Sequence, residues 1–154
     1  IKTIQLVAPA GIHVKGVAKG DIFLWTPEER VRNLFVDQKF ADQRLAMPVT
    51  DEMVDIGLKN ELATADLAWH PRFHHPRVRK WIHRIDVPTL IVWGAKDRLV
   101  PLRDADRFVE AIGDNASKVV YEDTGHVAML ERPARFNADV EKFLLEGDPE
   151  GRTQ

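Results

Sequence analysis

Two side chains that could share acid–base chemistry stand at similar places in this 154-residue sequence. Asp97 follows the apolar run 87–94, and His126 follows a second run, 118–121. A carboxylate beside an imidazole fixes the tautomer of the ring and stabilises its protonated form, which is how a histidine becomes a general base. The sequence therefore predicts an acid–histidine pair if the fold brings the two residues together.

The sequence patterns around these two residues predict that the fold brings them together. Residues 87–94 are continuously apolar and rich in β-branched side chains, which is typical of a strand buried on both faces. Residues 101–112 have the pattern of an amphipathic helix, and 118–121 that of another strand. A strand–helix–strand unit returns the chain to the same edge of a parallel sheet, beyond which ligands bind. We expect Asp97 and His126 to meet at that edge.

The rest of the chain predicts one further strand and several helices. Residues 4–8 have the pattern of a short, mostly buried strand, and residues 20–85 form a mostly helical block. Thr26 and Glu29 predict a capping box at the start of a helix that Pro48 interrupts. Three more helices are expected, one opening after Thr50, one over 77–85 and one over 133–145.

Two motifs in this order resemble the α/β-hydrolase family. They are V-P-T-L-I-V-W-G-x-x-D over 87–97 and G-H-x-x-x-x-E-x-P over 125–133. The resemblance implies that Asp97 is the catalytic acid and His126 the catalytic histidine. It also implies an α/β fold made of strands six to eight of the family's sheet, with a helical lid inserted between strands six and seven.

The same resemblance divides the chain into parts. Residues 1–12 and 86–147 are expected to form the C-terminal part of the hydrolase core, 13–85 the lid, and 148–154 a disordered tail. Glu131 is expected to satisfy backbone donors ahead of the last helix.

The resemblance also suggests residues that contact a small-molecule substrate. Trp25 and Trp69 lie in the expected lid, where aromatic side chains either line the pocket or anchor the core. Leu99 and Val127 stand beside the acid and the histidine, so the family pattern places them near the substrate too. No cofactor is implied.

The sequence departs from the family at the nucleophile. The family carries it in a G-x-S-x-G turn, or in an Asp or Cys version of that turn, and no such motif occurs here. The chain has no cysteine, and its one serine, Ser117, is expected to be a turn residue just before a strand. We therefore expect the C-terminal half of a hydrolase, inactive alone, with roughly a hundred further residues upstream. The exposed edge of strand 4–8 would pair with that missing half or with a second copy.

Composition narrows the function classes. The 22 basic and 24 acidic residues give a net charge of −2, which argues against a nucleic-acid binder held by bulk positive charge. No apolar run is long enough for a membrane span and no signal peptide is visible, so we expect a cytoplasmic protein. Residues 70–84 hold four histidines and five Lys or Arg side chains; a solvated face is favoured there over an anion site or a metal site.

These observations favour a hydrolase that acts on a small, largely apolar ester or related acyl compound. Epoxide hydrolases, dehalogenases and carbon–carbon bond hydrolases share the same layout, so the reaction subclass stays open. A non-catalytic binding or assembly module of the same fold is the remaining alternative.

Overall fold

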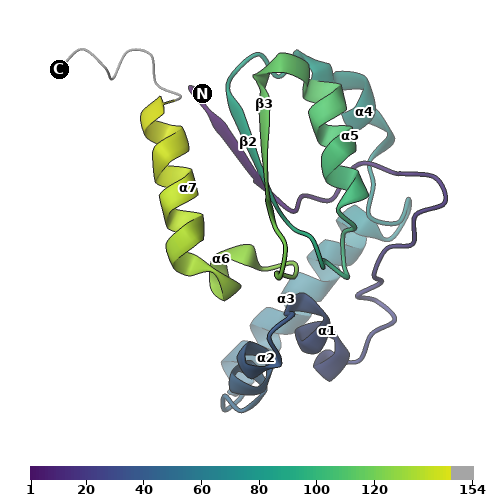
Figure 1. Ribbon diagram of the computed structural model, residues 1–154. Helices are drawn as coiled ribbons and strands as arrows, with labels where there is room; N and C mark the ends of the chain where they lie inside the picture. Colours follow the sequence, from purple (N-terminus) through teal and green to yellow (C-terminus); the bar gives the residue numbers. More distant parts are fainter. Residues whose placement is uncertain (147–154) are drawn as a thin grey trace.

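A three-stranded parallel sheet is the centre of the fold in the computed structural model, which describes residues 1–146 (Figure 1). The strand order is β1-β2-β3, and both neighbouring pairs are parallel. Every residue of β2 is buried, as its continuous apolar pattern predicted. The expected tail over 148–154 lies outside the described residues. The strands are β1 (Ile4–Val7), β2 (Thr89–Gly94) and β3 (Ala116–Tyr121).

Helices cover both faces of this sheet, and alternate side chains of β2 meet them. Ile91 and Trp93 join a core cluster with Phe108 of α5, whereas Leu90 and Val92 join a cluster packed against α7. Figure 1 shows α5 and α7 on opposite sides of the strands. This two-sided burial fixes the position of β2 and of the turn that follows it. The helices of this part are α5 (Arg103–Ile112), α6 (Ala128–Glu131) and α7 (Pro133–Glu146).

The helical block contributes four α-helices and a short 3₁₀ helix, and α1 to α3 lie beyond the carboxyl ends of the strands (Figure 1). The predicted capping box is present, because Thr26 and Glu29 each accept a hydrogen bond from the other's backbone N–H. Thr50 caps the next long helix. The elements are α1 (Pro27–Leu34), α2 (Gln38–Leu45), α3 (Asp51–Ala68), α4 (Pro76–Trp81) and η1 (Ile82–Arg84).

The expectation of one helix from Thr26 to Pro48 is wrong, because α1 ends at Leu34 and α2 begins at Gln38. The backbone N–H groups of Val36 and Asp37 donate to the carboxylate of Glu131, over 2.8 and 2.9 Å. These donors therefore serve a distant side chain instead of a continued helix.

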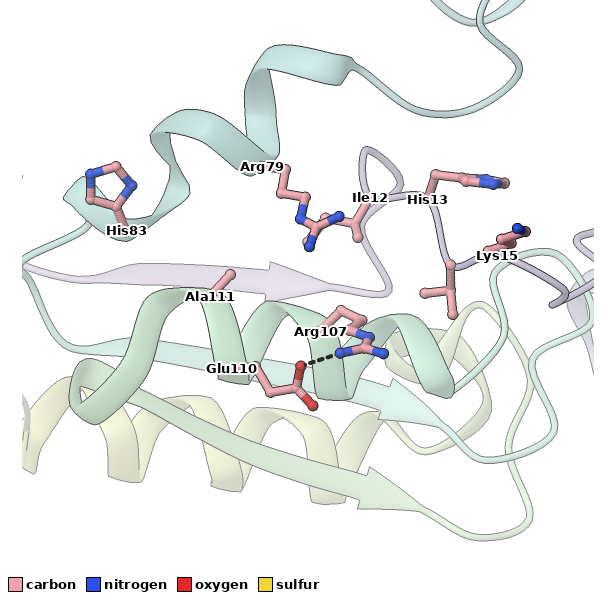
Figure 2. Close-up of a pocket in the computed structure, with 9 residues that line it drawn as sticks. Ile12, His13, Lys15, Arg79, His83, Arg107, Glu110 and Ala111 are labelled. Atoms are coloured by element: carbon pink, nitrogen blue, oxygen red, sulfur yellow. Dashed lines mark hydrogen bonds and ion pairs between the residues drawn. The ribbon is translucent and has the colours of Figure 1, made fainter.

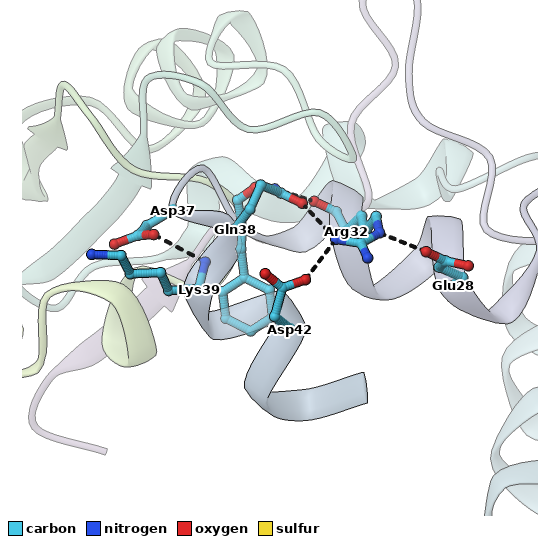
Figure 3. A network of polar contacts seen from close by, with 7 residues as sticks. Glu28, Arg32, Asp37, Gln38, Lys39 and Asp42 are labelled. Carbon is cyan, nitrogen blue, oxygen red and sulfur yellow. Dashed lines mark hydrogen bonds and ion pairs between the residues drawn. The ribbon is translucent and has the colours of Figure 1, made fainter. Parts of the chain in front are cut away.

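A polar network on the surface joins α1 to α2 (Figure 3). The Arg32 guanidinium donates to Glu28 over 2.7 Å and to Asp42 over 3.0 Å, and these two carboxylates raise the pKa of Arg32. Gln38 donates its side-chain N–H to the carbonyls of Arg32 and Phe35. Since these groups are largely exposed, the network contributes little to the stability of the fold.

Ser117 lies inside β3 and is not the turn residue that the sequence suggested. The strand begins at Ala116, because its backbone pairs with Thr89 at the start of β2. The Ser117 hydroxyl donates to the Thr89 carbonyl at 3.5 Å. Over residues 1–146, no helix combines the length and apolarity that crossing a membrane requires.

Candidate active site

The carboxylate of Asp97 is held in place by the turn that follows β2. Its Oδ1 accepts hydrogen bonds from the backbone N–H groups of Leu99 (2.8 Å) and Val100 (2.9 Å). The side chain is fully buried, with 0% of its surface exposed. One carboxylate oxygen thus anchors the group to its own turn, and the other is left to act on a partner.

That partner is His126, as the sequence predicted. Its Nδ1 lies 2.9 Å from Oδ2 of Asp97. Because an ionised carboxylate only accepts hydrogen bonds, this contact places the ring proton on Nδ1 and leaves Nε2 as a proton acceptor. The imidazole side chain is 22% exposed, so the ring is not fully enclosed.

Backbone contacts bring the two loops together. The N–H of Ala95 donates to the Tyr121 carbonyl and that of Lys96 to the Thr124 carbonyl, over 2.9 and 3.0 Å. A Cβ at Gly94 would stand 2.1 Å from the Gly125 carbonyl oxygen, so this approach requires a glycine. The ammonium of Lys96 also pairs with Asp123 at 2.6 Å and lowers the pKa of that carboxyl.

The histidine loop, residues 122–127, is also tied to the helical block. Glu131 is 3% exposed; its carboxylate accepts from the N–H of Gly125 over 2.5 Å and from Val36 and Asp37 on the block. The N–H of His126 donates to the Leu34 carbonyl over 2.9 Å. Glu131 satisfies a backbone donor ahead of the last helix, as expected, and also binds two donors on the helical block, which the sequence did not indicate.

An apolar pocket of about 330 Å³ opens beside His126. Its wall combines the end of β1, the turn after Asp97 and the C-terminal half of α3, so the sheet and the helical block share it. The lining residues are Ala8, Ala10, Thr64, Leu67, Ala68, Phe73, Leu99, Val100 and His126.

Of the four residues predicted to contact substrate, the structure brings only Leu99 to this pocket. Trp25 packs its ring against Gly20, and Val127 is the N-cap of α6. Trp69 lies edge-on to Phe23, with ring centroids 5.2 Å apart, and is 56% exposed. For all four residues, contact with a substrate stays a prediction.

Sequence reasoning missed the side chains that α3 supplies to the pocket wall. Thr64, Leu67 and Ala68 follow one another at helical i, i+3, i+4 spacing, so they share one face of α3. That spacing was the available signal. Phe73 follows the helix at a positive φ of 50° and completes this part of the wall.

The part of the chain that the structure describes contains no group of three or more His, Cys, Asp or Glu side chains placed to hold a metal ion. It holds an acid and a histidine, and its single serine lies within a strand. This arrangement moves protons but needs a nucleophile to form a triad.

Comparison with known proteins gives the family. Residues 27–133 match the family model described as the alpha/beta hydrolase fold. The chain belongs to the α/β-hydrolase fold family. The expected fold class is thereby confirmed, and the parallel sheet with helices on both faces agrees with part of that fold.

Several curated hydrolases are similar in sequence. A 2-hydroxy-6-oxononadienedioate/2-hydroxy-6-oxononatrienedioate hydrolase of Paraburkholderia xenovorans (strain LB400) is 32% identical over 127 residues, which are 75% of this chain and 40% of that protein. A hydrolase of the same description from Pseudomonas putida is 35% identical over 107 residues, 64% of this chain and 37% of that protein. The chain thus spans well under half of the curated relatives it matches.

Solved α/β hydrolases share the fold. A serine hydrolase involved in carbazole degradation superimposes with a TM-score of 0.66 and 25% identity, over 94% of this chain and 54% of that structure. A meta-cleavage product hydrolase from Pseudomonas fluorescens IP01 gives a TM-score of 0.66 at 22% identity, over 96% of this chain and 57% of that one.

Proposed function

We propose that this chain supplies the acid and the histidine of a hydrolase triad, with Asp97 and His126 in those roles. The single observation that carries the proposal is the 2.9 Å contact between His126 Nδ1 and a fully buried Asp97 carboxylate. The nucleophile would come from residues outside this sequence, which agrees with the 40% share of its relative that the chain matches.

The chemistry follows from the geometry of the pair. His126 Nε2 takes the proton of the nucleophile as that group attacks a carbonyl carbon. Asp97 holds the ring in the required tautomer and stabilises its protonated form. The protonated ring then delivers its proton to the leaving group.

The lining of the apolar pocket favours a small, largely apolar acyl compound as the substrate. Apart from Thr64 and His126, its lining consists of apolar side chains. Relatives named as hydrolases of 2-hydroxy-6-oxo acids favour cleavage of a carbon–carbon bond next to a carbonyl over cleavage of a simple ester.

In this proposal the segment 13–85 acts as a lid, because α3 provides one wall of the pocket. The free edge of β1 would pair with the part that carries the nucleophile, or with a second copy.

The deciding experiment is carried out on a protein that contains this chain together with its nucleophile. Asp97→Asn should lower kcat on the order of 10⁴-fold, as loss of the acid does in other triads, and His126→Ala should have a comparable effect. His70→Ala is the matched control, since His70 is exposed and does not line the apolar pocket. Full activity in Asp97→Asn would overturn the assignment.

The 154-residue chain alone tests the other half of the proposal. It should not hydrolyse an activated aryl ester, because the pair has no nucleophile to deprotonate. Turnover by the chain that disappears in His126→Ala would show that the nucleophile is present after all.

A further inference from the structure

A second pocket, which we call the basic pocket, lies on the α5 side of the sheet (Figure 2). Its volume is about 570 Å³, within the usual range for small-molecule sites. It shares no lining residue with the apolar pocket beside His126. The loop after β1, the helices α4 and η1, and α5 line it with Ile12, His13, Val14, Lys15, Arg79, His83, Arg107, Glu110 and Ala111.

Positive charge dominates this lining, although the whole chain carries a net charge of −2. Three cationic side chains face a single acid, Glu110, which pairs with Arg107 at 2.5 Å. Within residues 1–146, the side chains of Lys15 and Arg79 form no ion pair or hydrogen bond. These two cations come from different elements, the loop after β1 and α4, and line the same hollow.

Contacts behind the lining hold the loop in place. The ammonium of Lys19 donates to the Ile12 carbonyl over 2.6 Å and pairs with the buried Asp104 of α5. The ring of His13 lies 5.0 Å from that of His74, in the segment just before α4. The loop is therefore fastened to both neighbouring walls, which reduces the entropy that a bound ligand must remove.

We propose that the basic pocket binds a phosphate-bearing anion with at least two negative charges, as an organic phosphate or a diphosphate. The planar fork of Arg79 suits two oxygens of one phosphate, and the ammonium of Lys15 provides a point charge for another. Ile12, Val14 and Ala111 add apolar surface, which would contact the carbon part of an organic phosphate. The site is one of binding and is independent of the proposed triad.

The test is a titration of the ¹⁵N-labelled 154-residue chain with inorganic pyrophosphate at constant ionic strength, followed by NMR. We expect saturable shifts of the backbone amides of residues 12–15, 79–83 and 107–111. A parallel titration with an organic diphosphate, methyl diphosphate, should shift the same amides, and citrate should bind more weakly. Citrate binding as tightly as pyrophosphate would contradict the phosphate assignment.

Two variants from separate elements locate the site. Arg79→Gln and Lys15→Gln should each weaken pyrophosphate binding about tenfold, the cost of one charged hydrogen bond. Arg77→Gln is the matched control, since Arg77 lies on the same helix, is exposed and does not line the pocket. Non-saturable shifts, or equal weakening in all three variants, would overturn the proposal. Because no turnover is measured, this result is independent of whether the triad proposal holds.

Discussion

The sheet and the helical block of this chain are held by different forces. All six residues of β2 are buried, whereas none of the 18 residues of α3 is. Large apolar side chains of α3 remain exposed, among them Leu58 at 56% and Leu67 at 84%. Hydrophobic burial thus fixes the sheet, whereas α3 contributes no buried side chain to the core.

This difference separates two properties of the candidate site. Asp97 follows β2 and His126 follows β3, so the geometry of the pair depends on the sheet. The far wall of the apolar pocket comes from α3, so its shape depends on how the block is attached. Substitutions in the sheet should therefore destabilise the whole molecule. Substitutions at the contact between Glu131 and the helical block should first change the shape of the apolar pocket.

The largest expected effect comes from removing a core side chain of β2. Ile91→Ala should lower the free energy of unfolding by about 2–5 kcal/mol, because Ile91 is fully buried between the sheet and α5. Leu58→Ala on α3 is the control and should change it by no more than about 0.5 kcal/mol. Urea denaturation of both variants measures this, and similar losses would show that α3 is as well packed as the sheet.

A smaller effect is expected where the block is attached. Glu131→Gln replaces one acceptor oxygen with a donor that faces backbone N–H groups, which should cost about 1–3 kcal/mol. The amides of Val36 and Asp37 should then exchange with solvent faster, while those of β2 stay protected.

Glu28→Gln is the matched control for this change, since Glu28 is 63% exposed and pairs only on the surface with Arg32. Its unfolding free energy should stay within about 0.5 kcal/mol of the parent. If the amide hydrogens of Val36 and Asp37 exchange at an unchanged rate in Glu131→Gln, Glu131 does not hold the helical block to the histidine loop.

The sequence was sufficient to predict the acid–histidine pair because its signals are local. The apolar run of β2 determines a buried strand, and the turn after it gives Asp97 its backbone donors at positions two and three residues later. The capping box at Thr26 is local as well. Each of these contacts joins residues that are close in the chain, and Asp97 and His126 belong to one strand–helix–strand unit.

The missed features depend on contacts between distant segments. At the break after α1, the N–H groups of Val36 and Asp37 bind Glu131, almost a hundred residues further along the chain, a contact that no local pattern reveals. The restart of the helix did have a local signal, because Asp37 is the N-cap of α2. Ser117 joins β3 because its neighbours pair with β2, although its own sequence resembles a turn. The pocket wall from α3 requires the packing of the block on the sheet, which α3's weak, mostly exposed apolar pattern does not specify.

The smallest expected effect concerns the ion pair that bridges the two loops of the site. In the native chain Lys96 holds the pKa of Asp123 below its ordinary value of 3.8. Stability from this pair is therefore complete above pH 3.8 and is lost as the pH falls from there through the lowered pKa. In Lys96→Met the pKa of Asp123 should rise toward 3.8, and this part of the acid dependence should vanish.

A ¹³C NMR titration of the Asp123 carboxyl measures the change, and Lys59→Met is the control, since Lys59 forms a similar exposed pair with Asp55 on α3. The His126 ring signals should stay unchanged in Lys96→Met, because the backbone bond from Lys96 to Thr124 remains and the strands still set the loops. Altered His126 signals would mean that the side chain of Lys96, and not the sheet alone, positions the pair. The distinction between residues positioned by the sheet and residues positioned by surface contacts would then not hold for Asp97 and His126.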